Sequence, residues 1–262
     1  MDAQPSIRVI ASQRERYMRP GWEERLSRFP FIDKWTRREA GYGAEHVEIP
    51  PSLRLYGQSV DLDRPVVGIG GTRSPSVEAF KSAFALAKCV AKRGGVVCSG
   101  GVPGVDLAAH LGALDASGGT TLAVLANPVE GGLSGHEWDC MRVSDAIAAN
   151  GAFISEYEHT VSTDTAEFRR RLLQRDRIIT ALSGVFVMFE SSPASATMDS
   201  AKRAAIQGRP VFAQARGATL QRQGPAIAIR AGLAEALPDG DPDRVAKMLI
   251  GIAEATQRCE PV

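Results

Sequence analysis

Two glycine-rich turns contain the residues whose types and spacing are best suited to hold a phosphate. The first is GGTR at 70–73, and the second is SGGVPGVD at 99–106. Glycines let the backbone approach a ligand, and the free N–H groups of a following helix point at it. A tight strand-to-helix turn without a ligand is the alternative interpretation. The candidate binding residues of the two turns are Gly71, Thr72, Arg73, Gly100, Gly101 and Gly104.

An arginine-rich segment, FRRRLLQRDRII at 168–179, is the strongest local charge signal. On a helix, Arg171 and Arg175 share one face, and Phe168 lies one turn before Arg171. Guanidinium groups fit phosphate oxygens, and an aromatic ring can stack on a base. We therefore predict that Phe168, Arg171, Arg175 and Arg177 contact nucleic acid. A solvated helix face balanced by nearby carboxylates is the alternative.

A third polar segment, ESSPASATMDSAKRA at 190–204, follows another apolar run. Ser195 suits the N-cap of the next helix, which is the favoured interpretation, but it could also bind a ligand with Lys202 nearby. Glu156 and Glu190 end predicted strands and could form a carboxylate pair.

Signals for catalysis are weak in this sequence. The four histidines show no metal-ligand spacing, and His110, inside a predicted helix, is typical of a core histidine. Neither a dinucleotide fingerprint nor a Walker sequence is present, because Arg73 stands where the third glycine of GxGxxG would be. We expect no catalytic residue, no metal and no cofactor.

The elements that must position these residues alternate between strand and helix. Strands with apolar character on both faces imply a parallel sheet covered on both sides, and right-handed crossovers then give a doubly wound, Rossmann-like α/β fold with helices on both faces. Ligands of such sheets bind at the carboxyl ends of the strands, where we expect the polar clusters to meet. Strands are predicted at 53–57, 66–70, 94–99, 120–126, 152–156, 185–190 and 209–215. Helices are predicted at 15–29, 77–92, 106–116, 136–148, 166–182, 195–207, 225–235 and 243–256.

The composition and the chain length limit the class of protein. The sequence has 262 residues, of which 44% are hydrophobic and 23% charged, and its formal net charge is +1. A nucleic-acid role must therefore come from local basic clusters. Four dispersed cysteines, no signal peptide and no membrane-span pattern lead us to expect a cytoplasmic, soluble protein with no membrane role. We divide it into an irregular or helical N-terminal arm (1–60), a Rossmann-like domain (61–235) and a C-terminal helix (236–262).

Seven segments in register, over about 185 residues, resemble the DprA/Smf family of DNA-processing proteins. GGTR stands where that family has GSR, and SGGVPGVDLAAHLGAL stands where it has SG-x-ARGID-xx-AH-xx-AL. The other matching segments are GTTLAVL, GAFISEY, FRRRLLQRDRII, ESSPASATMDSA and GRPVFAQARG.

The resemblance implies a function that the residues alone do not establish. It implies single-stranded DNA binding and the loading of a RecA-type recombinase during DNA uptake (natural transformation) and recombination. It also implies an extended Rossmann-like fold, a homodimer, no catalysis, and a DNA-phosphate pocket. By position, that pocket would be lined by Arg73, Gly100, Gly104, Arg175 and Arg177.

Two departures from the family pattern motivate a different class of function. Val102-Pro103 stands where the family has Ala-Arg, and Asp176 stands where it has Asn. The expected pocket is therefore smaller and less basic than in the family pattern. This favours, as the alternative, a nucleotide-binding Rossmann protein, either a nucleotide sensor or a phosphoribohydrolase-like protein, without a DNA role. A scaffold that binds a protein partner through the N-terminal arm is a third hypothesis.

Overall fold

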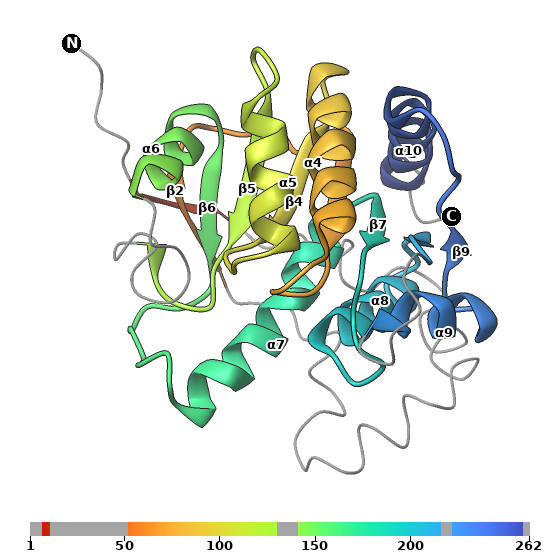
Figure 1. Ribbon diagram of the computed structural model, residues 1–262. Coiled ribbons are helices and arrows are strands. Elements are labelled where there is room, and N and C mark those ends of the chain that lie inside the picture. Colours follow the sequence, from red (N-terminus) through yellow and green to blue (C-terminus); the bar gives the residue numbers. More distant parts are fainter. Residues whose placement is uncertain (1–6, 11–51, 130–140, 216–221, 259–262) are drawn as a thin grey trace.

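A mostly parallel sheet forms the centre of the protein (Figure 1). A computed structural model describes residues 7–10, 52–129, 141–215 and 222–258, and within them nine strands form one sheet in the order β1-β2-β6-β5-β4-β3-β7-β8-β9. The strands are β1 (Ile7–Ile10), β2 (Leu53–Gly57), β3 (Val66–Gly70), β4 (Val96–Gly100), β5 (Thr120–Val124), β6 (Ala152–Ser155), β7 (Val185–Met188), β8 (Val211–Ala213) and β9 (Glu235–Ala236).

Strand pairing confirms the doubly wound arrangement. The pairs β1–β2 and β2–β6 are antiparallel, and every other pair in the sheet is parallel. From β3 the chain adds β4 and β5, with β6 beyond them, and then crosses over to β7 on the other side of β3. The topological switch point therefore lies between β3 and β7, where the loops after these strands diverge.

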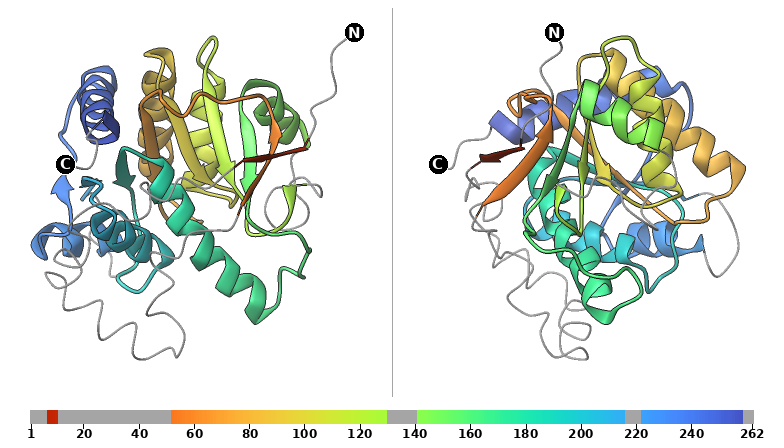
Figure 2. Two further views of the ribbon diagram at one scale, coloured as in Figure 1. Left: turned by 180° about the vertical axis from the view of Figure 1, so that it is seen from behind. Right: turned by 90° about the vertical axis from the view of Figure 1, so that its left-hand side faces the viewer.

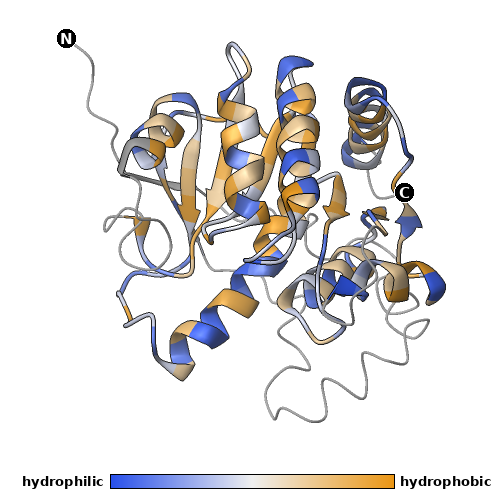
Figure 3. Ribbon diagram, in the orientation of Figure 1, coloured by the Kyte–Doolittle hydropathy of each residue, from blue (hydrophilic) through white to orange (hydrophobic). Residues whose placement is uncertain are grey.

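Helices cover both faces of the sheet, as the two views of Figure 2 show. Helices α4, α5, α6 and α10 lie on one face, and α7, α8 and α9 lie on the other. The apolar sides of α4, α5 and α10 form one core cluster, those of α7, α8 and α9 form a second, and α6 packs with β5 and β6 in a third. The central strands between the helices are mostly hydrophobic (Figure 3). The helices are α4 (Val77–Lys92), α5 (Val105–Leu114), α6 (Met141–Asn150), α7 (Ala166–Leu182), α8 (Ala196–Ile206), α9 (Gly224–Arg230) and α10 (Pro242–Arg258).

Local sequence explains where the helices next to the switch point begin. Ser76, Thr165 and Ser195 are the N-cap residues of α4, α7 and α8, and each side-chain oxygen accepts a hydrogen bond from a backbone N–H three residues later. Of the helices that the structure describes, none has the length and apolar composition needed to cross a bilayer.

Most predicted elements agree with the structure, and one is wrong in part. The strand at 66–70 and the helices at 77–92 and 166–182 agree residue for residue. The helix predicted at 225–235 ends at Arg230, because Gly232 adopts a φ of +68° and turns the chain into β9. The predicted helix at 15–29 and residues 136–140 lie outside the described residues.

The sheet and its core extend beyond the predicted 61–235 unit at both ends. Strand β2 pairs with β6, although it precedes residue 61. At the other end, Val245, Ala246, Leu249 and Ala253 of α10 are buried in the same core cluster as α4 and α5. The division into three parts stays a prediction, but these segments pack with the Rossmann-like part.

Candidate binding site at the switch point

A pocket opens at the carboxyl ends of β3, β4 and β7, where the doubly wound topology places ligands. Its volume is about 460 Å³, within the range of roughly 300–1,000 Å³ that is usual for small-ligand sites. Helices α5 and α8 both begin at its wall. The polar and charged residues of the lining are Thr72, Arg73, Asp106, Arg175, Asp176, Ser191, Ser192, Ser195, Thr197 and Ser200.

The two glycine turns and the loop after β7 are joined by backbone contacts. The N–H of Val105 donates to the carbonyl of Thr72 at 3.1 Å, and the N–H of Thr72 donates to the carbonyl of Glu190 at 2.7 Å. Gly104 has a φ of +92°, and a Cβ atom there would overlap the backbone of Thr72 and Arg73. Glycine is thus required at 104 by both conformation and space.

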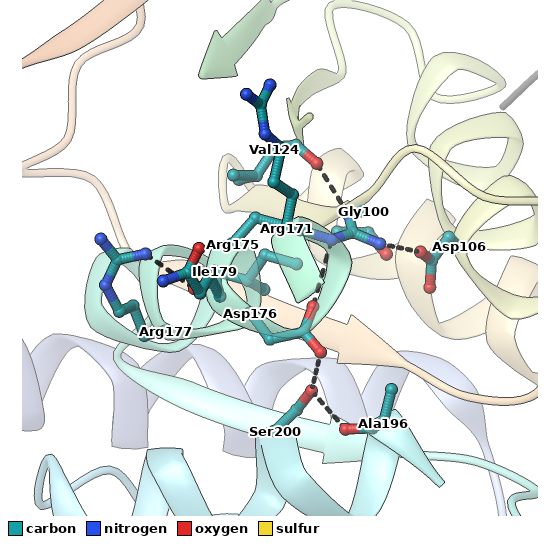
Figure 4. Close-up of polar contacts among 12 residues, drawn as sticks. Gly100, Asp106, Val124, Arg171, Arg175, Asp176, Arg177, Ile179, Ala196 and Ser200 are labelled. Carbon is teal, nitrogen blue, oxygen red and sulfur yellow. Dashed lines mark hydrogen bonds and ion pairs between the residues drawn. The ribbon is translucent and has the colours of Figure 1, made fainter. Parts of the chain in front are cut away.

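Arg175 lies beneath the second glycine turn, with its side chain directed at Gly100 (Figure 4). A Cβ atom at Gly100 would overlap the guanidinium, so the absent side chain makes room for it. Nη1 of Arg175 donates to the carbonyl of Val124 at 2.7 Å. Its other nitrogens face carboxylates: Nη2 lies 3.7 Å from Asp106 Oδ2, and Nε lies 3.1 Å from Asp176 Oδ1.

Burial disfavours the ionised forms of Asp106 and Asp176. It raises the pKa of Asp106 above the ordinary value, while the Arg175 guanidinium acts in the opposite sense. Burial also raises the pKa of Asp176 from 3.8 to about 6, against the opposing effects of Arg175, Arg203 and Ser200. The sequence analysis did not single out Asp106 or Ser200 as site residues, although Asp106 closes the second glycine turn.

The raised pKa of Asp176 makes the stability of the fold depend on pH. Between about pH 4 and pH 6 the folded protein holds a proton that the unfolded chain has released, so this group's contribution to stability falls as the pH rises through that window. We expect the wild-type protein to lose roughly 1–3 kcal/mol of unfolding free energy relative to Asp176→Asn between pH 4 and pH 7.5. Urea unfolding at several pH values measures this, and a constant difference between the two proteins would contradict it.

Two residues that were predicted to contact nucleic acid, Phe168 and Arg177, have buried side chains. Arg177 is 2% exposed, and its Nη1 and Nη2 donate to Glu156 Oε1 and Oε2, each at 2.6 Å. Phe168 is 5% exposed and packs with Val102, Ala126 and Leu172, so its ring offers no face for a base.

Arg171 does not face the pocket either. Its guanidinium lies 4.3 Å from the centre of the Tyr157 ring and donates to the His159 carbonyl at 2.6 Å and to Glu167 at 3.0 Å. In Figure 4 it leaves α7 in a different direction from Arg175. Arg171 and Arg175, which were predicted to share one helix face, therefore lie in different environments. Arg171 contacts residues outside the pocket, and Arg175 lines the pocket.

The remaining sequence predictions divide between the pocket and its surroundings. Gly71, Thr72 and Arg73 line the pocket, whereas the buried Gly100, Gly101 and Gly104 shape the turn behind it. Ser195 caps α8, which was the favoured interpretation, and it also lines the pocket. Lys202 is outside the lining, and burial lowers its pKa.

Glu156 and Glu190 do not form the carboxylate pair that their positions suggested. Glu156 is paired with Arg177, whereas Glu190 accepts hydrogen bonds from the backbone and hydroxyl of Ser76 and from Arg222. Each therefore stabilises a different loop.

His110 is a buried core histidine, as predicted. Its Nε2 lies 2.9 Å from the Gly100 carbonyl and its Nδ1 lies 2.7 Å from the Thr121 hydroxyl. Burial lowers its pKa to about 4, so the ring is neutral and positions the glycine turn.

A Rossmann-like sheet with a polar pocket at its switch point defines a class of ligand-binding proteins, and comparison with known proteins narrows that class. The sequence pattern of the family described as DNA recombination-mediator protein A matches residues 36–248. The chain belongs to this family.

Relatives and solved structures agree with that assignment. The chain is 35% identical over 148 residues to a putative DNA processing protein DprA of Mycobacterium tuberculosis, covering 55% of this chain and 35% of that protein. It is 28% identical to DNA processing protein DprA of Bacillus subtilis, covering 56% of this chain and 47% of that protein. The chain thus spans between a third and a half of these relatives' lengths.

Two solved structures share the fold. DNA processing protein A from Helicobacter pylori, whose structure concerns its single-stranded DNA binding mode, matches with a TM-score of 0.64 at 27% identity. That match covers 78% of this chain and 89% of the other. DNA processing protein A (DprA) from Streptococcus pneumoniae matches with a TM-score of 0.63 at 26% identity, covering 80% of this chain and 71% of that one.

Proposed function

We propose that this protein binds single-stranded DNA at the switch-point pocket, with a backbone phosphate held at the pocket's edge by Arg73. One observation carries the proposal. Arg73 is exposed and lines the pocket, and within the described residues its side chain forms no hydrogen bond or ion pair. The positive ends of α5 and α8 meet the same pocket, which favours a bound anion.

The family supports the rest of the proposal. Under this proposal, the protein acts in DNA uptake and recombination and loads a RecA-type recombinase onto the bound strand. It works in the cytoplasm as a homodimer, and holding the DNA requires no chemical step and no cofactor. The single-stranded DNA binding described for the Helicobacter pylori protein is consistent with this role.

Binding of a labelled oligo(dT), followed by fluorescence anisotropy at several salt concentrations, tests the proposal directly. We expect affinity to fall steeply with salt, because phosphates that are neutralised by the protein release counterions. Competition with duplex DNA and with a mononucleotide belongs in the same experiment. If the mononucleotide competes as well as the strand, the protein is a nucleotide binder, and if oligo(dT) is not retained at low salt, the proposal fails.

Arg73→Ala is expected to weaken oligo(dT) binding about tenfold at low salt and to reduce the salt slope by about one ion. The physical reason is the loss of one charge-assisted contact to phosphate. Arg244→Ala is the matched control, because Arg244 is an exposed arginine of α10 outside the pocket lining. Equal affinities of the two variants would show that Arg73 does not contact the strand.

A further inference from the structure

The inner wall of the pocket contains two carboxylates for one guanidinium. Asp106, Arg175 and Asp176 all line the pocket and are 6%, 4% and 5% exposed. With all three ionised, this part of the wall has a net charge of −1. A phosphate placed there would meet two like charges at close range, so Arg175 is a poor phosphate ligand and the inner wall suits another part of the DNA.

Among the residues that the structure describes, two buried polar atoms of this wall have no hydrogen-bond partner. They are Nε of Arg175, whose approach to Asp176 is an ion pair without hydrogen-bond geometry, and Oγ of Ser191. Both residues line the pocket. Buried polar groups are paired in most structures, so unpaired ones favour a small shift of the wall that lets a ligand or water pair with them. Both atoms are covered in the structure, and Ser191 Oγ lies against Gly224, so pairing with a ligand requires that shift.

The hydrogen-bonding capacity of the wall selects the kind of ligand. The ionised Asp176 carboxylate only accepts, and it receives one hydrogen bond, from the Ser200 hydroxyl at 2.9 Å. Its remaining lone pairs require donors. Arg175 Nε requires an acceptor, and the Ser191 hydroxyl can serve either role. The wall therefore matches a group with adjacent donors beside an acceptor.

Among the four DNA bases, guanine alone presents that order on its Watson–Crick edge. Its ring N1–H and amino N2–H lie side by side, next to the O6 acceptor. Adenine and cytosine each place a single amino donor beside an acceptor, and thymine places one ring N–H between two carbonyls. Unstacked bases of single strands are commonly read on this edge.

We propose that the pocket binds a guanine base of single-stranded DNA, with N1–H and N2–H donating to Asp176. This inference rests on the proposed function, and it assigns the phosphate to Arg73 at the edge and the base to the inner wall. Asp176 is then the specificity-determining residue, at the position where the related family pattern has asparagine.

A set of oligo(dT) strands that differ at one central base tests this. The central base is guanine, hypoxanthine (deoxyinosine) or thymine. Deoxyinosine keeps N1–H and O6 but lacks the amino group. We expect the guanine strand to bind roughly 5–30-fold more tightly than the other two. Equal binding of the guanine and deoxyinosine strands would overturn the inference. If no strand binds, the proposed function itself fails.

Asp176→Asn supplies the second arm of the experiment. The amide offers one acceptor and one donor group in place of two acceptors, so the guanine preference should fall to within about twofold while oligo(dT) is still bound. Asp115→Asn, which removes an exposed carboxylate outside the pocket, is the matched control and should keep the preference. A preference that survives Asp176→Asn would exclude Asp176 as its source.

Acidification provides a readout that needs no variant. A protonated Asp176 carboxyl has one donor in place of an acceptor, so it no longer accepts from both guanine N–H groups. The charged and polar groups that affect its pKa are Arg175 from α7 and Asp199, Ser200 and Arg203 from α8. We expect the guanine preference to decline as the pH falls through about 6, while binding of oligo(dT) does not decline. A preference that is constant from pH 5 to pH 8 would contradict the assignment.

Discussion

Replacing Arg177 by alanine is expected to lower the free energy of unfolding by about 3–5 kcal/mol, the usual cost of leaving one charge of a buried pair without its partner. Arg177 is 2% exposed and donates twice to Glu156 and once to the Gln174 carbonyl. Without it, the Glu156 carboxylate stays largely buried and uncompensated. Urea denaturation followed by circular dichroism measures the loss.

Two variants test whether the loss of stability comes from the buried ion pair or from substituting any arginine of α7. Arg170→Ala removes an exposed arginine of the same helix, paired with Glu167 at 2.9 Å, and should cost no more than about 0.5 kcal/mol. Arg177→Met combined with Glu156→Gln removes both charges and should recover much of the loss. If Arg177→Ala were as stable as Arg170→Ala, the buried pair would contribute nothing to the fold. If Arg177→Ala is destabilised as expected, a loss of DNA binding in that variant needs no contact between Arg177 and DNA to explain it.

Gly104→Ala is expected to destabilise the protein by at least about 3 kcal/mol and to abolish binding at the pocket. A φ of +92° costs an alanine on the order of 1–3 kcal/mol. The added methyl would also overlap the Thr72 carbonyl and the Arg73 backbone, and backbone cannot move aside as a flexible side chain can. The two glycine turns would have to separate, and Arg73 would move with them.

Gly118→Ala isolates the conformational part of that cost. Gly118 also has a positive φ, of +70°, but nothing lies within 4 Å of the position of its Cβ. Its replacement should therefore cost only about 1–2 kcal/mol and leave DNA binding unchanged. Equal thermal stability of the two variants would show that contact between the turns is unimportant.

The alternation of strands and helices was predictable because the apolar runs and the capping residues are local signals. Val66–Gly70 and Val77–Lys92 are examples in which both boundaries agree. Strand β9 was not predictable in the same way, because two exposed residues, Glu235 and Ala236, have no strand pattern and pair only because the chain returns to β8.

The place of the site was predictable, but its charge balance was not. Glycine turns after β3 and β4 must meet at one edge of a parallel sheet, so the position of Arg73 followed from topology. The arginines of α7 look alike in the sequence, yet the second half of the helix lies under the sheet. Arg175 there meets Asp106, 69 positions earlier in the chain, and no local pattern reveals such a partner.

The pocket draws its wall from segments that are far apart in the chain, and this has a consequence for synthesis. Its first lining residue is Ile69 and its last is Ser200. A polypeptide that is still emerging from the ribosome therefore has no complete pocket until α8 has left the exit tunnel. Truncated products that end before this helix should accordingly be unable to compete with the full-length protein for its ligand.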